Sequence, residues 1–371
     1  MLRRNQHNSV EGVPVKPPSR DQLTIDFPRF VEEGEAGMRE MAGVGRLQQD
    51  LRPVPAEEVF TFGKCKLYLA DCLDWLARQP AQSIHAVVTD PPYGLVEYSE
   101  KEQAKLRRGR GGVWRIPPSF DGHQRAPLPR FTTLTKQDLV RLETFFGDWA
   151  RALVPILVPG AHVIIATNPV LSYLVARPLV DAGLERRGEV VRLVMTMRGG
   201  DRPKNAHDEF PDVSVMPRSM FEPWLLFRKP LEGRVQDNLR KWRTGALRRP
   251  SAGQPFGDVI VSSPTRPSER AHAQHPSLKP QSFLRQLVRA VLPFGEGVVL
   301  DTFAGSGSTL AAAEAVGYGS VGVENDRRYF KMAASAVPFL AGLAPPGDRP
   351  NSVESARSPR ARASKSGSPG R

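Results

Sequence analysis

The chain has 371 residues, which is long enough for one large α/β domain or two smaller ones. Its formal net charge of +13 exceeds what solubility requires and indicates a polyanionic partner, with nucleic acid as the first expectation. The two cysteines, Cys65 and Cys72, exclude a disulfide framework and lack the spacing of metal ligands, so no metal site is expected.

The chain carries no pattern that predicts a membrane protein or a secreted one. The first residues, MLRRNQHNSV, lack the apolar run of a signal peptide. No segment reaches the roughly 18 continuous apolar residues that a membrane-spanning helix needs. We therefore expect a soluble, cytoplasmic protein that makes no membrane contact.

Both ends of the chain are predicted to lie outside the fold. Residues 1–58 lack steady periodicity and indicate a partly disordered extension with one short helix near 30–51. Residues 344–371 are rich in proline, serine, glycine and arginine, so they predict a disordered basic tail. The core should therefore form between these two segments.

Strand and helix patterns alternate between the two ends. Strands are predicted at 66–70, 85–90, 159–167, 189–196, 222–227, 297–301 and 320–324, and helices at 71–80, about 139–153, 169–182, 281–292, 308–316 and from about 326. Strands separated by helices indicate an α/β fold with a doubly wound, mainly parallel sheet and helices on both faces.

The first motif with chemical meaning is VVTDPPYGL at 87–95, which ends a buried strand with an acid, two prolines and an aromatic ring. Asp90 is followed by Pro91, Pro92 and Tyr93. Proline fixes its own φ and restricts the residue before it, so the Asp90 carboxylate and the Pro91 carbonyl should be held rigidly. A polar turn that closes a strand would explain the acid and a proline, but not all four residues.

The second motif lies at 298–326, where a glycine-rich turn joins a strand to a helix and a second strand ends in an acid. Gly305 and Gly307 allow a sharp turn and a close ligand, and Glu324 follows at the spacing at which a carboxylate meets ribose hydroxyls. The turn lacks the glycine pattern and the Gly-Lys-Ser/Thr of phosphate binders, which favours a phosphate-free nucleoside over NAD or ATP. Tight packing of the strand against the helix is the alternative.

Three segments together resemble one enzyme family. DPPY at 90–93, HPSLKP at 275–280 and DTFAGSGS at 301–308, in this order, resemble the S-adenosyl-L-methionine-dependent amino methyltransferases of DNA, in particular the permuted subgroup whose catalytic half comes first. These enzymes modify adenine N6 or cytosine N4. The resemblance extends over about residues 60–335.

The resemblance implies a fold, a cofactor and partners. It implies a Rossmann-like methyltransferase sheet with inserted DNA-recognition loops, S-adenosyl-L-methionine as the cofactor and double-stranded DNA as the substrate. It also implies a prokaryotic, nucleoid-associated protein of a restriction-modification system, with a second copy of the chain and a cognate restriction endonuclease as candidate partners.

The resemblance also suggests how the DPPY residues act. A base inside a duplex cannot present its amino group, so it must be flipped into a pocket. There Asp90 and the Pro91 carbonyl would each accept one N–H, which frees the nitrogen lone pair, while Tyr93 stacks on the base. An acid at the first position favours adenine N6, with cytosine N4 as the alternative.

Other classes fit less well. A cytosine-C5 methyltransferase would need a cysteine after proline, and a protein-glutamine methyltransferase would have asparagine in place of Asp90. A non-catalytic DNA-binding module remains the alternative from a different class.

The resemblance assigns the cofactor pocket to Asp301, Phe303, Gly305, Ser306, Gly307, Glu324, Ser277, Lys279 and Pro280. Asp301 would orient the methionine end, Glu324 would hold the ribose, and Lys279 with its neighbours would close over the methionine carboxylate. Asp71 matches a position near the target base, although a helix N-cap explains it equally well. His275 is expected to order its loop rather than to move a proton.

Three regions follow from these assignments: a catalytic half at 59–230, a target-recognition segment at 231–274 and a cofactor-binding half at 275–343. DNA contacts are predicted in the loop at 95–134 and in the basic set at 241–250, with GGDRPKNAHDEF at 199–210 sharing recognition. The candidate residues are Arg107, Arg108, Arg110, Trp114, Arg115, Lys241, Arg243, Arg248 and Arg249.

Overall fold

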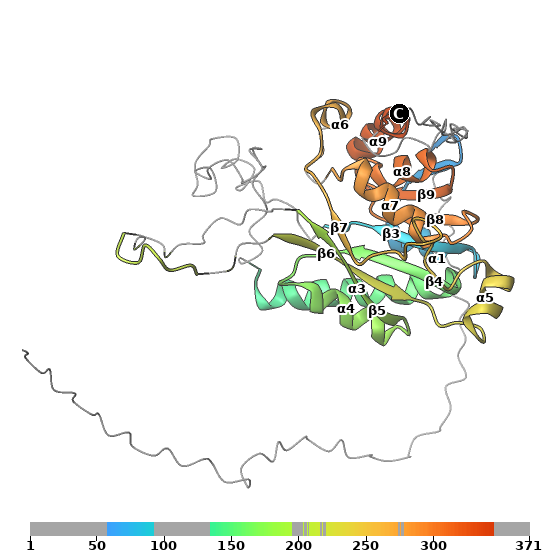
Figure 1. Ribbon diagram of the computed structural model, residues 1–371, viewed down its shortest axis with the longest axis horizontal. Coiled ribbons are helices and arrows are strands. Elements are labelled where there is room, and N and C mark those ends of the chain that lie inside the picture. The colour runs from blue at the N-terminus through green and yellow to red at the C-terminus, as the bar shows by residue number, and fades with distance from the viewer. Residues whose placement is uncertain are drawn as a thin grey trace, which may run out of the picture. The chain divides into compact units, whose positions relative to one another are not determined.

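A nine-stranded sheet forms the centre of the protein, with the strand order β1-β2-β9-β8-β3-β4-β6-β5-β7 (Figure 1). The structure, a computed structural model, describes residues 58–92, 134–194, 203, 206, 208–215, 217, 220–273, 275 and 278–344. The predicted extension before residue 58, the basic tail after 344 and almost all of the 95–134 loop lie outside these residues.

The strands are β1 (Val59–Phe62), β2 (Cys65–Leu69), β3 (Ile84–Thr89), β4 (Leu157–Ala166), β5 (Glu185–Leu193), β6 (Phe221–Arg228), β7 (Val259–Val261), β8 (Val298–Asp301) and β9 (Gly319–Glu324). The helices are α1 (Cys72–Ala77), α3 (Lys136–Ile156), α4 (Ser172–Asp181), α5 (Val235–Trp242), α6 (Pro267–His272), α7 (Gln281–Val291), α8 (Ser308–Ala315) and α9 (Arg327–Gly342).

The sheet is mainly parallel, which confirms the predicted doubly wound α/β fold. Strands β2, β9, β8, β3 and β4 pair in parallel as its centre. Strand β6 pairs antiparallel with both β4 and β5, and β1 pairs antiparallel with β2. The carboxyl ends of the central strands therefore share one edge, which is where open α/β sheets bind their ligands.

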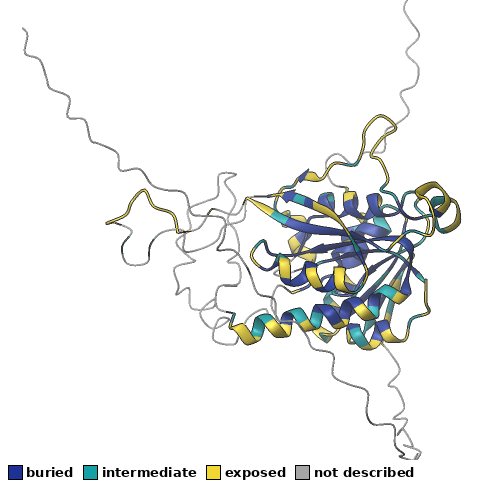
Figure 2. Ribbon diagram, turned by 90° about the horizontal axis from the view of Figure 1, so that it is seen from below, coloured by how far each residue is buried: buried dark blue, intermediate teal, exposed yellow. Residues whose placement is uncertain are grey.

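Helices cover both faces of this sheet, and side chains that alternate along each strand fill both interfaces. On β3, Val87 packs in the cluster that α1, α3 and α4 cover, whereas Ala86 and Val88 pack in the cluster beneath α7 and α8. Figure 2 shows the buried sheet between its two helical layers. Burial of both faces explains why β3 is apolar along almost its whole length.

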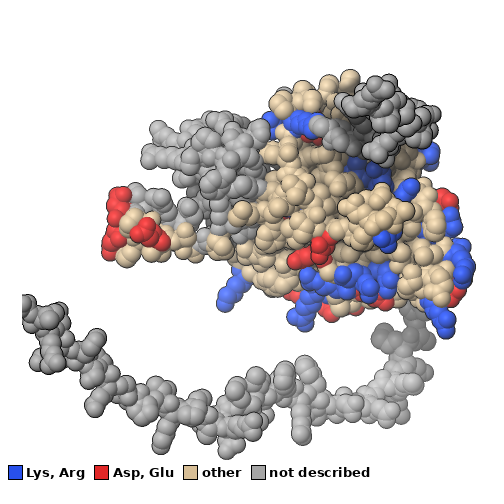
Figure 3. Space-filling model, in the orientation of Figure 1, with Lys and Arg blue, Asp and Glu red and all other residues tan. Residues whose placement is uncertain are grey.

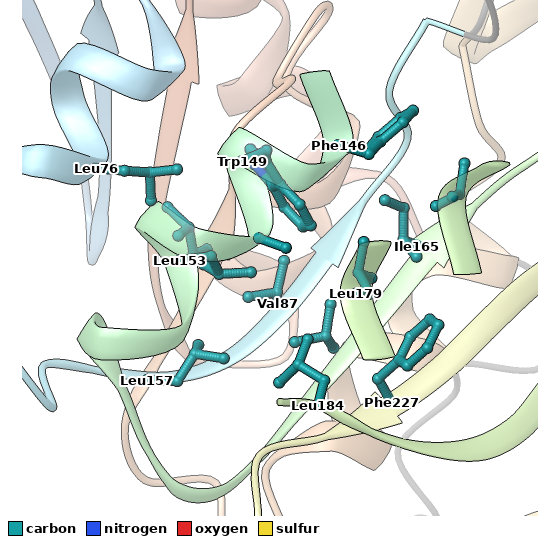
Figure 4. Close-up of a cluster of buried hydrophobic side chains, with 14 of the residues drawn as sticks. Leu76, Val87, Phe146, Trp149, Leu153, Leu157, Ile165, Leu179, Leu184 and Phe227 are labelled. Carbon is teal, nitrogen blue, oxygen red and sulfur yellow. The ribbon is translucent and has the colours of Figure 1, made fainter. Parts of the chain in front are cut away.

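The helix α3 carries the largest side chains of the first cluster and begins at a well-formed cap. Thr135 and Asp138 make a capping box, in which Asp138 N–H donates to Thr135 Oγ1 at 3.2 Å and Thr135 N–H donates to Asp138 Oδ2 at 2.9 Å. Phe146, Trp149 and Leu153 on its inner face are buried against β3 and α4 (Figure 4). Their burial holds α3 against the sheet.

Within the described residues, the structure confirms the strands and helices that the periodicity predicts and adds β1, α5, β7 and α6, whereas the helix predicted near 30–51 lies outside them. Strands β1 and β7 and helix α6 are too short to carry much hydrophobic periodicity, whereas α5 is missed because it is short and mostly polar and buries only Asn238. Three of these four elements lie in 231–274, the segment predicted to recognise the target. None of the described helices combines the length and apolarity needed to cross a membrane.

Candidate active site

A cavity of about 460 Å³ opens at the carboxyl edge of the parallel strands. Its lining brings together residues from motifs far apart in the sequence, among them Asp71, Asp90, Lys279, Asp301, Phe303 and Glu324. The sheet order explains this meeting, because β3, β8 and β9 are neighbours and all end at this edge. Residues predicted for catalysis and residues predicted for the cofactor thus meet in one cavity.

Asp301 ends β8 as a buried carboxylate. Its Oδ1 accepts hydrogen bonds from Thr89 Oγ1 at 2.6 Å and from Phe303 N–H at 3.1 Å. Burial raises the pKa of Asp301 to about 6, although these hydrogen bonds and one from Thr309 act in the opposite direction. A positive charge close to Asp301 would therefore stabilise the ionised form of this buried carboxylate.

The glycine-rich turn is anchored to α3 through its first residues. Trp149 Nε1 donates to Thr302 Oγ1 at 3.0 Å. The Phe303 ring lies 6.2 Å from the Trp149 ring and 6.1 Å from the Phe145 ring, measured between centroids. These contacts fix Phe303 in the cavity wall, while its contact with the cofactor stays a prediction.

The two glycines of the turn have different roles. Gly305 has φ +51°, lines the cavity and donates its N–H to Glu324 Oε2 at 2.8 Å. Gly307 has φ +77°, and a Cβ placed there would lie 2.5 Å from Val337 Cγ2 on α9. The predicted close approach to a ligand therefore fits Gly305, whereas Gly307 is required by helix packing and does not line the cavity. Ser306 is buried and lines the cavity.

Glu324 ends β9 and closes another side of the cavity. Its Oε2 accepts from Gly305 N–H, and its Oε1 accepts from Asp326 N–H at 2.8 Å. Burial raises the pKa of Glu324, and the charges of Asp301 and Asp326 add to the effect. The two backbone donors fix its orientation, while each carboxylate oxygen keeps capacity for a further donor such as a ribose hydroxyl.

Asp90, directly after β3, contacts Lys279 in an ion pair whose side chains are 14% and 9% exposed. Lys279 Nζ also lies 3.8 Å from Glu222 Oε1 at the start of β6. The sequence predicts Lys279 at the cofactor carboxylate, whereas here it joins two protein carboxylates. Pro91 is buried, Pro92 lines the cavity, and Tyr93 lies outside the described residues.

Asp71 fits both interpretations left open by the sequence. Its Oδ1 accepts from Leu73 N–H at 2.8 Å, which makes it the N-cap of α1, and it also lines the cavity.

His275 packs edge-on against Tyr329 with centroids 4.5 Å apart. Burial, followed by the charge of Lys279, lowers the pKa of His275 to about 4.

The remaining residues of HPSLKP have simpler placements. The backbone carbonyl of His275 accepts from Leu278 N–H at 3.2 Å, as expected for a residue that orders its loop. Pro280 is buried at the start of α7, and Ser277 lies outside the described residues.

The basic set at 241–250 lies at the opposite edge of the sheet. Arg243 donates to both carboxylate oxygens of Glu296, just before β8, and Arg248 donates to the Tyr318 hydroxyl at 2.6 Å, just before β9. Lys241 pairs with Glu232, and Arg249 is exposed. The structure does not bring these residues to the cavity, so their contact with DNA stays a prediction.

Basic side chains lie on several parts of the surface that Figure 3 shows. Some lie along its lower part, where Figure 1 shows α4, β5 and α5, mixed with acidic ones, and others lie near the top and the right side. The candidate arginines and Trp114 of the 95–134 loop lie outside the described residues.

Sequence reasoning misses several residues of the site. Glu222, Trp224 and Arg192 form a polar group beside Lys279, and Thr89 bonds to Asp301. An acid at the start of an otherwise apolar strand, EPWLLF, is the one signal that points to Glu222. Within the described part of the chain, no three His, Cys, Asp or Glu side chains form a group that could hold a metal ion.

Comparisons with known proteins identify relatives of the chain. The model of the N6/N4 methyltransferase family, described as DNA methylase, matches residues 84–335. The type II methyltransferase M.HindIII of Haemophilus influenzae is 23% identical over 293 residues, which cover 72% of this chain and 94% of the relative.

Two solved structures are also similar. The cytosine-N4-specific PvuII DNA methyltransferase is 15% identical with a TM-score of 0.48, covering 76% of this chain and 86% of the other. The M1.HpyAVI–SAM complex is 15% identical with a TM-score of 0.43, covering 72% of this chain and 97% of the other.

Proposed function

Because the chain belongs to the N6/N4 DNA methylase family, we propose that it transfers a methyl group from S-adenosyl-L-methionine to the amino group of a base flipped out of double-stranded DNA, adenine N6 in preference to cytosine N4. One observation carries the proposal: the Asp90 carboxylate faces the same cavity as Asp301 and Glu324. The acceptor for the reacting amine and the carboxylates for the cofactor thus line one cavity.

The cavity residues fit S-adenosyl-L-methionine. Glu324, fixed by two backbone donors, would accept hydrogen bonds from the ribose hydroxyls, and the buried Asp301 would accept from the ammonium of the methionine end. The Phe303 ring supplies an apolar wall beside them. When bound, the cofactor supplies a methyl group on a positively charged sulfur, which suits a cavity lined by carboxylates.

Asp90 would activate the target nitrogen. The lone pair of an exocyclic amine is delocalised into the base, so the nitrogen is a weak nucleophile. A carboxylate and the Pro91 carbonyl that each accept one N–H draw the nitrogen toward a tetrahedral geometry and localise the lone pair. Such fixed acceptors lower the barrier mainly through positioning and electrostatics, without a covalent enzyme intermediate.

The preference for adenine rests on the acid at position 90. Within the resembled family, an acid at the first position with tyrosine at the last is the usual form for adenine N6. The two amines are chemically alike, and one arrangement can activate either, so cytosine N4 is the second candidate.

The test is to incubate the protein with unmethylated DNA and a labelled methyl donor, digest the DNA to nucleosides and separate them by mass. N6-methyladenine is the expected product. N4-methylcytosine alone would reject the adenine assignment while keeping the mechanism. An Asp90→Asn variant, matched in size, controls for contaminating activity. Retention of the donor without any methylated product would favour the non-catalytic DNA-binding module.

Two further partners are proposed with the function. A cognate restriction endonuclease would suit a protein similar to a type II methyltransferase. DNA from cells that express the protein should then be protected from cleavage at specific sites. A homodimer is tested by sedimentation with and without DNA.

A further inference from the structure

Four charged side chains of alternating sign form a row from the cavity into the sheet. Lys279 contacts Asp90 and lies 3.8 Å from Glu222, and Arg192 NH1 donates to Glu222 Oε2 at 3.2 Å. They come from four separate parts of the chain: the end of β3, the loop before α7, β6 and β5. The row connects the proposed catalytic acid, Asp90, to β5 and β6, which carry neither of the two sequence motifs.

Glu222 is the most firmly held member of the row. The Trp224 indole N–H donates to its Oε1 at 2.8 Å, and Arg192 holds its Oε2. Arg192 is fixed in turn, because its Nε donates to Ser262 Oγ at 3.0 Å and its NH2 donates to the Ser263 carbonyl at 3.4 Å. The Glu222 side chain is only 14% exposed. Its position is therefore set by β5, β6 and the segment after β7.

The charge on Glu222 is maintained by its neighbours. Burial opposes ionisation, but Lys279 and Arg192 together hold the pKa of Glu222 below its usual value. Glu222 is therefore an anion at neutral pH, placed between two cations. Without this anion, the two cations would face each other in a poorly solvated site, and Lys279 would lose the carboxylate on the side away from Asp90.

We propose that Glu222 is a positioning residue for methyl transfer, which holds Lys279 against Asp90 so that the Asp90 carboxylate stays ionised and correctly aimed at the target amine. The inference rests on the proposed function. Lysine has a long, flexible side chain, and its ammonium group is placed well only when several acceptors surround it. Lys279 contacts Oδ2 of Asp90, and an ionised carboxylate has enough lone pairs to accept an amine N–H as well.

The experiment compares single-turnover methyl transfer in wild type and Glu222→Gln, with binding of DNA and of S-adenosyl-L-methionine measured separately. We expect the transfer rate to fall about 10- to 100-fold, the range expected for a misplaced catalytic group, with both affinities little changed. Glu222→Asp, which keeps the charge, should recover part of the rate. A wild-type rate in Glu222→Gln would overturn the inference.

A matched control lies on the same pair of strands. Glu185 and Arg228 are cross-strand partners on β5 and β6, as Arg192 and Glu222 are, and they form an ion pair of 2.6 Å at the other end of the strands. Glu185→Gln should leave the transfer rate unchanged. An equal loss of rate in Glu185→Gln and Glu222→Gln would show a general effect on the sheet and would overturn the positioning role.

A double-mutant cycle tests whether Glu222 acts through Lys279. If it does, Glu222→Gln should not slow a Lys279→Met protein any further. Independent, multiplying losses would overturn the inference.

If Glu222→Gln fails to fold, the charge-balanced double variant Arg192→Met, Glu222→Gln removes both members of the buried pair and should fold. This double variant should still transfer the methyl group slowly. A wild-type rate of methyl transfer in the double variant would reject the positioning role. An inactive wild type would reject the proposed function itself, whereas an active wild type with insensitive variants rejects only the role of Glu222.

Discussion

The buried carboxylate of Asp301 should make the ligand-free protein less stable than an otherwise identical protein with a neutral side chain at this position. Asp301 is 3% exposed, and burial raises its pKa from 3.8 to about 6. This shift corresponds to about 3 kcal/mol of unfavourable free energy for the ionised folded form. The Asp301→Asn side chain keeps an oxygen that can accept hydrogen bonds from Thr89 and Phe303. Because the amide cannot ionise, the substitution should remove the free-energy cost of a buried charge.

The pH dependence follows from the direction of the shift. Below pH 3.8 Asp301 is protonated in the folded and the unfolded chain, and its full contribution to stability is present. Between pH 3.8 and about 6 the unfolded chain releases the proton while the folded protein retains it, so stability falls as the pH rises. The gain from Asp301→Asn should therefore approach about 3 kcal/mol at pH 8 and disappear only below about pH 3.

Urea unfolding of the ligand-free protein, followed by circular dichroism at several pH values, measures this difference. Asp148→Asn, at a side chain that is 48% exposed on α3, is the control and should change stability little at any pH. Calorimetry should show that Asp301→Asn also weakens binding of S-adenosyl-L-methionine. A variant that is less stable than wild type at pH 8, or a difference that is constant with pH, would refute the reasoning.

The other predictions concern the catalytic acid, the ribose acceptor and the glycine turn. Asp90→Ala should nearly abolish methyl transfer while cofactor and DNA binding persist, because Asp90 acts chiefly in the transition state; loss of cofactor binding in a filter assay would contradict this role. Glu324→Ala should weaken cofactor binding more than it slows the chemical step, and equal cofactor affinity by calorimetry would argue against the ribose contact. Gly307→Ala should destabilise the protein by about 2–4 kcal/mol in urea unfolding, since it adds a strained backbone to a collision with Val337. Gly317→Ala, with φ +80° and open space around it, isolates the backbone part and should cost about 1–2 kcal/mol; equal losses would rule out the collision.

Much of the fold could be predicted from local patterns. The alternation of strands and helices is visible because each central strand is apolar on both faces and each long helix has one apolar face, as in α3. The short β7 and the polar α5 were not predicted, because a three-residue strand carries no periodic signal and an eight-residue, mostly polar helix carries only a short one. Only pairing with β5 and packing against β4 define them.

The candidate site was predictable where it lies on motifs. DPPY and the glycine turn place Asp90, Asp301, Phe303 and Glu324 at strand ends, and a parallel sheet brings such ends to one edge. The basic residues at 241–250 show the limit of that reasoning, because their composition suggests DNA contact but says nothing of which edge they occupy.

By itself the sequence determined the class of fold, the order of the strands along the chain and the two motifs, because periodicity, glycine and proline act over a few residues. Only the tertiary structure decided which side chains meet. Lys279 reaches Asp90 across 189 residues because α7 and its preceding loop pack beside β3, and Glu222 reaches Lys279 because β6 is reversed and presents its amino end at the cavity edge. Such contacts depend on the order and direction of strands in the sheet, which the packing of all the elements together determines.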